Sequence, residues 1–364
     1  MRCKAIISFT LLLFAIGLHA QVPEYTRHIS RSFRINNSMT VDITNKYGRV
    51  QIITWDVDSV KFNIDLRIRA KDNQKLEKLK QSLEFEFTPG QYFVLARTKF
   101  GDSGSDVIKD IVDIAGAYLS TTNSVTINYT VMVPARVPLK IENKFGDVYF
   151  DDLEGPLNLI LSYGDLKANR LNGRTEIKLT SGDGDVNYMK DGQLYISYGN
   201  IHIGETEKLI AQTRSSIVTI DKSANLKLDS RRDKVYLNEA VSLSGDSYFS
   251  NINVTSLQKD LNFVSRYGDF TMNNIQTSFS LINLSSEYTN LALAFEKPML
   301  FNFELTHHQD VLFVYPKAFA SLKTKVFDVE NKIFTTSGTI GTGVTDSEVV
   351  IKAARKCSVT ISQK

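Results

Sequence analysis

Cysteine and proline are both scarce in this sequence, and charge of neither sign dominates it. The 364 residues include 2 Cys and 7 Pro, whereas aromatic residues make up 10%. A chain with this many aromatic residues and so little proline does not have the composition of a disordered segment. Its length is ample for a buried core, and all-β and repeat folds often use such a length as one body.

The near balance of charge excludes one class of partner. The sequence has 43 Lys and Arg against 40 Asp and Glu, and two of the basic residues, Arg2 and Lys4, lie in a segment that we expect to be removed. The remaining chain is close to neutral and contains no basic run. It therefore lacks the electrostatic footprint of a nucleic-acid-binding protein.

The first 20 residues have the features of a secretory signal peptide. Two basic residues are followed by an apolar run that ends at Leu18, and then by the small residue Ala20. The run is shorter than the ~20 residues that a membrane span needs. We therefore expect residues 1–20 to be a signal peptide and the mature protein to be exported, to the periplasm or the cell surface, without spanning a membrane. Cys357 is then the remaining thiol, which excludes an intrachain disulfide.

A short motif recurs along the chain, with an aromatic residue, Gly, a small polar residue and an aliphatic residue between two β-like runs. Its clearest copies contain Tyr47-Gly48, Phe145-Gly146-Asp147, Tyr163-Gly164-Asp165, Tyr198-Gly199 and Tyr267-Gly268-Asp269. A looser copy is centred on Gly184, and two more lie at 230–235 and 287–291. Glycine takes a positive φ at low cost, and a following Asp or Asn can bond to nearby backbone amides. The motif therefore predicts a repeated sharp turn.

The spacing of this turn predicts the fold class. Gly164 follows Gly146 by 18 residues, Gly184 follows Gly164 by 20, and Gly199 follows Gly184 by 15. Two short β-like runs between successive turns are typical of a β-solenoid, in which each coil pairs with the next. We predict an all-β, single-chain β-solenoid, expected as a right-handed β-helix, with a short α-helical insertion near its N-terminal end. The alternative is a meander folded into a sandwich, whose turns would recur every ~8 to 12 residues.

The same patterns divide the mature chain into three segments. Residues 21–37 are polar and lack periodicity, which indicates a loose N-terminal lead-in. Residues 38–135 are expected to form the first coils, with a helical insertion at 72–83 and a loop at 100–123. Asp72 is placed to cap that helix, and Leu76 and Leu79 fall at helical spacing. Residues 136–364 are expected to form the repeat β-solenoid.

Several of these features occur together in one known family. They are the stretch Asn45-Lys46-Tyr47-Gly48-Arg49-Val50 followed by Trp55-Asp56, the helix at 72–83, the strand that ends at Pro134 and the later Gly-Asp turns. Together they resemble the bacterial "putative adhesin" β-solenoid domain family, whose members are of unknown function. The resemblance implies an exported β-helix and brings no catalytic residue and no cofactor. The chain departs from the pattern at 230–233 and 307–310, where the glycine is lost.

The repeated acidic residues are the main candidates for chemistry. Asp147, Asp165, Asp183, Asp185 and Asp269 would line one edge if the turns are in register, as a Ca²⁺ site or as a carboxylate set for glycan cleavage. The simpler interpretation is that each bonds to its own turn. Asp183 and Asp185 are the best local cation candidates, although they lack the spacing of a calcium loop.

Other charged groups have simpler explanations. Arg231, Arg232, Asp233 and Lys234 could supply the charge that a polysaccharide lyase needs, but a solvated turn explains them better. His202 is expected to face outward, and the adjacent His307 and His308 point to opposite faces of a strand, which does not suit one metal. The tyrosines could either pack or stack on sugar rings.

We therefore predict a non-catalytic, exported cell-envelope protein, an adhesin-like β-solenoid scaffold that presents its surfaces to a glycan or a protein partner. The alternative is a β-helix enzyme, a lyase or a hydrolase, that acts on polysaccharide. The enzyme requires a cleft in which two carboxylates, or a carboxylate and a Lys or Arg, converge on one sugar.

Overall fold

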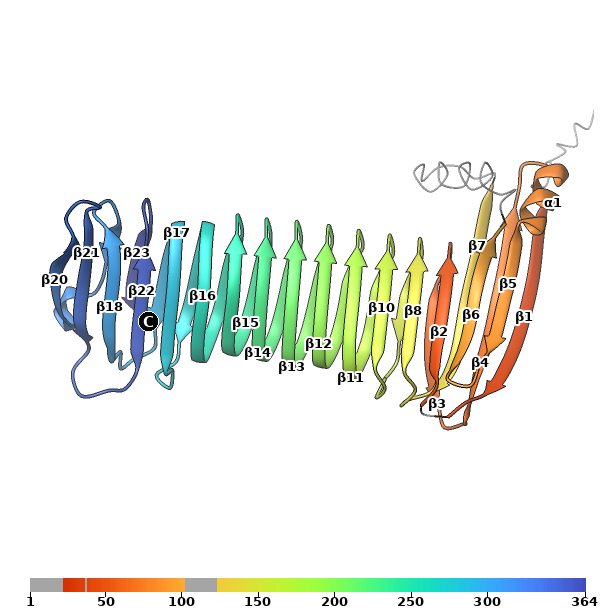
Figure 1. Cartoon of the computed structure of the whole chain (residues 1–364), viewed down its shortest axis with the longest axis horizontal. Coiled ribbons are helices and arrows are strands. Elements are labelled where there is room, and N and C mark those ends of the chain that lie inside the picture. The colour runs from red at the N-terminus through yellow and green to blue at the C-terminus, as the bar shows by residue number, and fades with distance from the viewer. Residues whose placement is uncertain (1–21, 37, 102–122) are drawn as a thin grey trace, which may run out of the picture.

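The computed structural model describes residues 22–36, 38–101 and 123–364. The expected signal peptide 1–20 and most of the expected loop 100–123 lie outside these residues. The described part is all-β apart from α1 (Asn73–Gln81) and a 3₁₀ turn, η2 (Lys317–Phe319), and its 23 strands belong to one long, mostly parallel sheet. Figure 1 shows the strands side by side along the long axis of an elongated molecule.

The central strands form a repeating series. Each long strand contains two or more segments that meet at a bend, and each segment pairs in parallel with a segment further along the chain. The strands are β8 (Leu139–Lys144), β9 (Val148–Phe150), β10 (Leu157–Ser162), β11 (Leu166–Thr180), β12 (Gly184–Ser197), β13 (Asn200–Arg214), β14 (Ile217–Arg231), β15 (Lys234–Tyr248), β16 (Asn251–Ile275) and β17 (Leu281–Phe295).

The register of this series is regular. Ile160 of β10 pairs with Lys178 of β11, and Lys178 pairs with Tyr195 of β12. On the other side of each bend, Val148 pairs with Leu166, and Leu166 with Gly184. Two rows of parallel pairs therefore run along the molecule, and we call the tight connection from the end of one row to the start of the other, such as residues 163–165, a corner.

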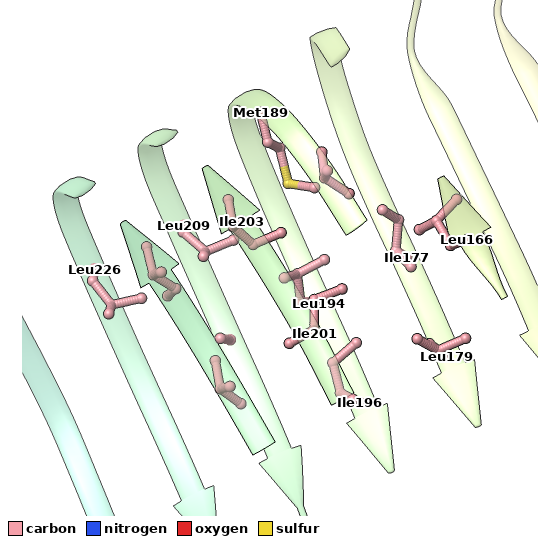
Figure 2. Close-up of a cluster of buried hydrophobic side chains, with 14 of the residues drawn as sticks. Leu166, Ile177, Leu179, Met189, Leu194, Ile196, Ile201, Ile203, Leu209 and Leu226 are labelled. Atoms are coloured by element: carbon pink, nitrogen blue, oxygen red, sulfur yellow. The ribbon is translucent and has the colours of Figure 1, made fainter. Parts of the chain in front are cut away.

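The core lies between the two rows. Strand residues alternate between buried and exposed positions, as expected when one face of each strand is covered. Figure 2 shows the buried side chains, including Ile177, Leu194 and Ile201, pointing into the space between facing strands. At ~25 cal/mol per Å² of apolar surface, this continuous column of aliphatic side chains is the main stabilising contribution to the fold.

The N-terminal end closes the series with antiparallel strands. In one row, β8 pairs in parallel with β2 and β2 with β6, and β5 then pairs antiparallel with β6. In the other row, β9 pairs in parallel with β3 and β3 with β7. Strand β4 then pairs antiparallel with β7, and β1 antiparallel with β4. The strands are β1 (Glu24–Arg34), β2 (Thr40–Lys46), β3 (Val50–Trp55), β4 (Ser59–Arg69), β5 (Leu83–Pro89), β6 (Phe93–Phe100) and β7 (Ser124–Pro134).

Two local predictions for this end have different outcomes. The helix is present, and the Asp72 side chain accepts the Lys75 N–H at 2.7 Å while Leu76 and Leu79 are buried. The predicted loose lead-in 21–37 is wrong, because Glu24–Arg34 is a full strand paired with β4. Its backbone pairing does not depend on side-chain alternation, and Ile29 is its one buried residue. As an edge strand it has little apolar pattern for a sequence to reveal.

The C-terminal end is also closed by antiparallel pairs. Strands β22 and β18 extend one row, and β21 and β20 then pair antiparallel beyond them, while β23 and β19 extend the other row. Their bounds are β18 (Phe301–His308), β19 (Leu312–Val314), β20 (Ala320–Asp328), β21 (Ile333–Ile340), β22 (Glu348–Ala353) and β23 (Ser358–Gln363).

Candidate functional site

The corners of the series carry an unusual backbone conformation. A non-glycine residue with φ between 51° and 65° stands at each of the successive corners Tyr47, Phe145, Tyr163, Ser181, Tyr198, Ser215, Arg232, Phe249, Tyr267 and Tyr288. We call these residues the corner column. The prediction that the motif glycine supplies the positive φ is therefore wrong for the corners from Gly48 to Gly199. The strained residue is the aromatic or polar one that precedes it, at about 1–2 kcal/mol per corner.

The corner glycines are needed for a different reason, namely close approach to the preceding corner. A Cβ added to Gly164 would lie 2.1 Å from the carbonyl oxygen of Gly146, and one added to Gly182 would lie 2.0 Å from that of Gly164. Gly182 is therefore the corner glycine of its repeat. Gly184, which we predicted for that role, is instead a buried residue of β12 that faces Ile201.

The acidic residues of the motif bond to the next repeat rather than to their own turn. Asp147 Oδ1 accepts the backbone N–H of Asp165 at 2.9 Å, and Asp165 Oδ1 accepts that of Asp183 at 2.9 Å. Asp183 Oδ1 in turn accepts both the backbone and the side-chain N–H of Asn200. Asp269 Oδ1 accepts the side-chain N–H of Asn290 at 2.9 Å. These carboxylates tie neighbouring repeats together.

The predicted cation pair is not brought together. Asp183 bonds to Asn200, whereas Asp185 Oδ1 lies 2.9 Å from Nδ1 of His202. Within residues 22–36, 38–101 and 123–364, no three His, Cys, Asp or Glu side chains are grouped so that they could hold a metal ion. His307 and His308 also have separate partners, Thr336 and Asp310.

His202 is nevertheless held between two carboxylates. It faces outward from β13, with Nδ1 at 2.9 Å from Asp185 and Nε2 at 3.0 Å from Asp221 Oδ2. Hydrogen bonds to Asp185 and then to Asp221 raise the pKa of the imidazole above its usual value. A doubly protonated ring donates from both nitrogens, which is the form that this arrangement favours.

Asp233 is a buried carboxylate, so a solvated turn does not explain it. It occupies the position of the missing corner glycine and is 3% exposed. Its oxygens accept hydrogen bonds from the Thr213 and Ser230 hydroxyls at 2.6 and 2.8 Å, and from the backbone N–H groups of Ser216 and Arg231, both at 2.8 Å. A carboxylate with four donors is satisfied without solvent, which makes it a structural group.

The aromatic residues of the corner column form two stacked groups. Tyr47, Phe145 and Tyr163 stack with ring centroids 5.4 and 5.0 Å apart. Further along, Phe249, Tyr267 and Tyr288 stack at 4.7 and 5.0 Å. Aromatic stacking is therefore not continuous along the corner column.

Tyr198 lies alone between these two groups. Its neighbours in the column are Ser181 and Ser215, and 57% of Tyr198 is exposed. Beside it, a surface cavity of about 700 Å³ is lined along the corner column by Tyr198, Ser215, Arg232 and Phe249. Its lining also includes the first residues of four strands, Asn200, Ile217, Lys234 and Asn251, which pair in succession. We call this surface the Tyr198 groove.

A second cavity of about 460 Å³ lies at the C-terminal end, where β18 and β21 pass beside β17 and β22. Its lining includes Arg266, Glu287, His307, Lys352 and Arg355. Glu287 is the one carboxylate in this lining, and its Oε2 lies 3.9 Å from Nε of Arg266. Glycoside hydrolysis by two carboxylates would need a second acid at this position.

Sequence reasoning missed both neighbours of Tyr198 in the corner column. Because Gly184 was taken as a corner, Ser181 was not recognised as a member of the column, and Ser215 carries no glycine motif at all, whereas Arg232 lies in the motif copy recognised at 230–235. The signal that would have found them is the distance of 17 residues from Tyr198 to Ser215 and from Ser215 to Arg232, which matches the regular register of β13 and β14.

Comparison with known proteins gives distant likenesses. No protein-family model matches the sequence, and no curated protein matches it. Among solved structures, a putative cell adhesion protein from Clostridium sporogenes is 9% identical, with 93% of this chain and 100% of that chain covered and a TM-score of 0.23. A putative adhesin from Parabacteroides distasonis is 11% identical, with 74% and 93% covered and a TM-score of 0.32.

A third structure, a putative lipid binding protein from Parabacteroides distasonis, is 11% identical, with 73% and 93% covered and a TM-score of 0.28. Proteins named as putative adhesins are thus found among the solved structures similar to this chain, as the sequence motifs indicated. Such low identities and TM-scores leave the function to be inferred from the chain itself. None of the described helices has the length and apolar character to cross a membrane.

Proposed function

We propose that this chain is a non-catalytic, exported cell-envelope protein, a rigid β-solenoid scaffold that presents the corner column to a partner outside the cell. The regular register supports the solenoid, because Val148, Leu166, Gly184 and Ile201 pair in succession along one row. A chain that makes one coil per repeat would produce this pattern, with antiparallel strands closing both ends and protecting the terminal edges.

One observation carries the adhesin-like role: exposed aromatic side chains follow a single line along the long axis. Tyr163, Tyr198 and Phe249 are 51%, 57% and 49% exposed. Aromatic side chains are enriched where proteins bind partners, and these three recur along one line, separated by one and by two corners. A carbohydrate or protein partner that extends along the axis would contact several repeats at once.

The enzyme alternative depends on the C-terminal cavity. Glu287, Arg266 and Lys352 place a carboxylate near basic groups there, which is the minimum for a lyase. Arg266 and Glu287 are equally well explained as an ordinary surface ion pair. The scaffold interpretation needs no chemistry from these groups, and we favour it.

Protease treatment of intact cells tests the proposal. An epitope tag is inserted after Val344, which is 98% exposed in the connection between β21 and β22. A protein confined inside the envelope serves as the internal control. We expect the tag to be lost while the control protein survives. Protection of both proteins would place the chain inside the envelope and contradict an adhesin-like role.

A further inference from the structure

The isolation of Tyr198 leaves both faces of its ring uncovered by aromatic neighbours. Strands in a sheet are about 4.8 Å apart, so residues two repeats away in the column are about 10 Å away. On one side of Tyr198 that residue is Tyr163, with Ser181 between them; on the other it is Arg232, with Ser215 between them. The column thus contains two adjacent gaps, each with a serine as its floor.

The width of these gaps selects the shape of the ring that fills them. Stacked rings elsewhere in the column are inclined by only 5° to 21° to one another, with centroids 4.7 to 5.4 Å apart, and Tyr198 has a similar backbone φ of 59°. A ring in the gap contacts the residue on each side at about 3.5–4.0 Å between carbon atoms. The two contacts take up about 7–8 Å of the ~10 Å gap and leave about 2 Å for the thickness of the ring itself. A flat base or indole leaves this space empty, whereas a puckered pyranose ring with its axial hydrogens fills it.

Charge at one end of the Tyr198 groove indicates the kind of sugar. Arg232 and Lys234 line the groove, are exposed, and have no ion-pair partner among the described residues. The neighbouring Asp233 is buried with four donors and does not reach them. Asp183 lies at the other end, three repeats from Lys234, or about 14 Å. A guanidinium and an ammonium together suit a carboxylate or a sulfate.

The remaining wall supplies hydrogen bonds. Asn200 and Asn251 also line the groove; Asn200 donates a side-chain N–H to Asp183 and Asn251 Oδ1 accepts the backbone N–H of Asp269, which leaves Asn200 Oδ1 and the Asn251 side-chain N–H groups for a ligand. The volume of about 700 Å³ lies in the usual range of small-ligand sites, and a mostly polar lining with two aromatic side chains suits a polar ligand.

We propose that the Tyr198 groove binds an acidic polysaccharide, with a pyranose ring over Ser215 against Tyr198 and an anionic substituent at Arg232 and Lys234. This inference rests on the proposed function and names the class of partner.

Titration calorimetry on the purified mature chain tests the inference. The probes are oligomers of polygalacturonate, alginate, heparin and polysialate, with a neutral cello-oligosaccharide and a single-stranded dT oligomer as comparisons. We expect at least one acidic glycan to bind, more weakly at high salt, and the neutral glycan and dT oligomer not to bind. Absence of binding to all four acidic glycans, or tighter binding of the dT oligomer, would overturn the proposal.

Variants locate the site. Tyr198→Ala and Arg232→Gln should each weaken binding by about tenfold or more, whereas Tyr92→Ala, which removes an exposed tyrosine of the β5–β6 turn, should leave it unchanged. Ser215→Tyr is the sharpest variant, because aromatic residues already occupy this backbone conformation at other corners. It should fold, as circular dichroism would show, but fill the gap and lower affinity at least tenfold.

Folded Ser215→Tyr protein that binds as tightly as wild type would contradict the site. The binding experiment is independent of location. A chain that binds acidic glycan but is protected from protease in intact cells would contradict the surface role and support the glycan site. A chain that is cleaved by protease but does not bind acidic glycan would support the surface role and contradict the glycan site.

Discussion

The Oδ1 atom of Asp165 accepts a hydrogen bond from the backbone N–H of Asp183, 2.9 Å away and 18 residues further along the chain. The same oxygen position in Asp147 accepts the N–H of Asp165. The acidic residue of the motif therefore acts between repeats, where it satisfies a backbone donor at the exposed corner that the strand ladder does not reach.

Replacing Asp165 should loosen the next corner locally. In Asp165→Ala the Asp183 N–H loses its acceptor, at a cost of about 0.5–1.5 kcal/mol. Amide hydrogen exchange should therefore show the Asp183 N–H exchanging roughly tenfold faster, while Lys167→Ala, an exposed change two residues further along in β11, leaves it unaltered. Unchanged protection of Asp183 in Asp165→Ala would show that the hydrogen bond contributes nothing to the corner.

The corner glycines should be intolerant of any side chain. In Gly164→Ala the new Cβ would lie 2.1 Å from the Gly146 carbonyl oxygen, so the two repeats must separate. We expect a loss of roughly 3 kcal/mol or more in the free energy of unfolding, measured by urea denaturation. Gly101→Ala is the control, because its Cβ would have no atom closer than 3.9 Å. Equal stability of the two variants would contradict the close packing of corners.

Loss of the buried carboxylate should also be severe. Asp233→Ala leaves the Thr213 and Ser230 hydroxyls and two backbone N–H groups without their acceptor, and each buried unsatisfied group costs about 1–3 kcal/mol. We expect a net destabilisation of at least about 3 kcal/mol in urea denaturation. Asp229→Ala removes an exposed carboxylate from the preceding strand and should cost less than about 1 kcal/mol. A small effect at Asp233 would mean that solvent reaches this corner.

His202 predicts a pH dependence of stability. Its pKa is raised in the folded state, so its stabilising contribution is complete below its unfolded pKa of about 6.5 and is lost as the pH rises through the folded pKa. The side chain is 44% exposed, so we expect only about 0.5 kcal/mol. NMR titration of the imidazole should give a pKa above that of a model peptide. His202→Gln should remove this part of the decline in stability between pH ~6 and pH ~9, and an unshifted NMR pKa would contradict the bridging geometry.

The sequence predicted the repeating strands well because their pattern is carried by buried aliphatic residues. It predicted the helix from Asp72, Leu76 and Leu79, which are local signals. It failed at Glu24–Arg34, where a strand forms through backbone pairing with little side-chain pattern. It also failed at Gly184, because Gly182 and Gly184 are two residues apart and the sequence alone does not show which of them stands at the corner.

The candidate site was predictable only in part. The tyrosines of the motif were recognised as possible sugar contacts, but which of them have open faces depends on the residues above and below them. Ser181, Ser215 and Arg232 acquire their importance from the register that stacks them beside Tyr198. Likewise, the burial of Asp233 follows from its place in that stack and not from its polar neighbours in sequence.

Pair-specific cross-linking tests the register on which the whole account depends. In a Cys357→Ser background, Ile160→Cys combined with Lys178→Cys places two thiols on directly paired residues, about 4.8 Å apart between strands. Ile160→Cys combined with Thr180→Cys offsets them by two residues, to about 8 Å, beyond disulfide range. The account predicts rapid disulfide formation on mild oxidation for the first pair and little for the second. Faster reaction of Ile160 with Thr180 would favour the 20-residue spacing to Gly184 and contradict the stacked corners.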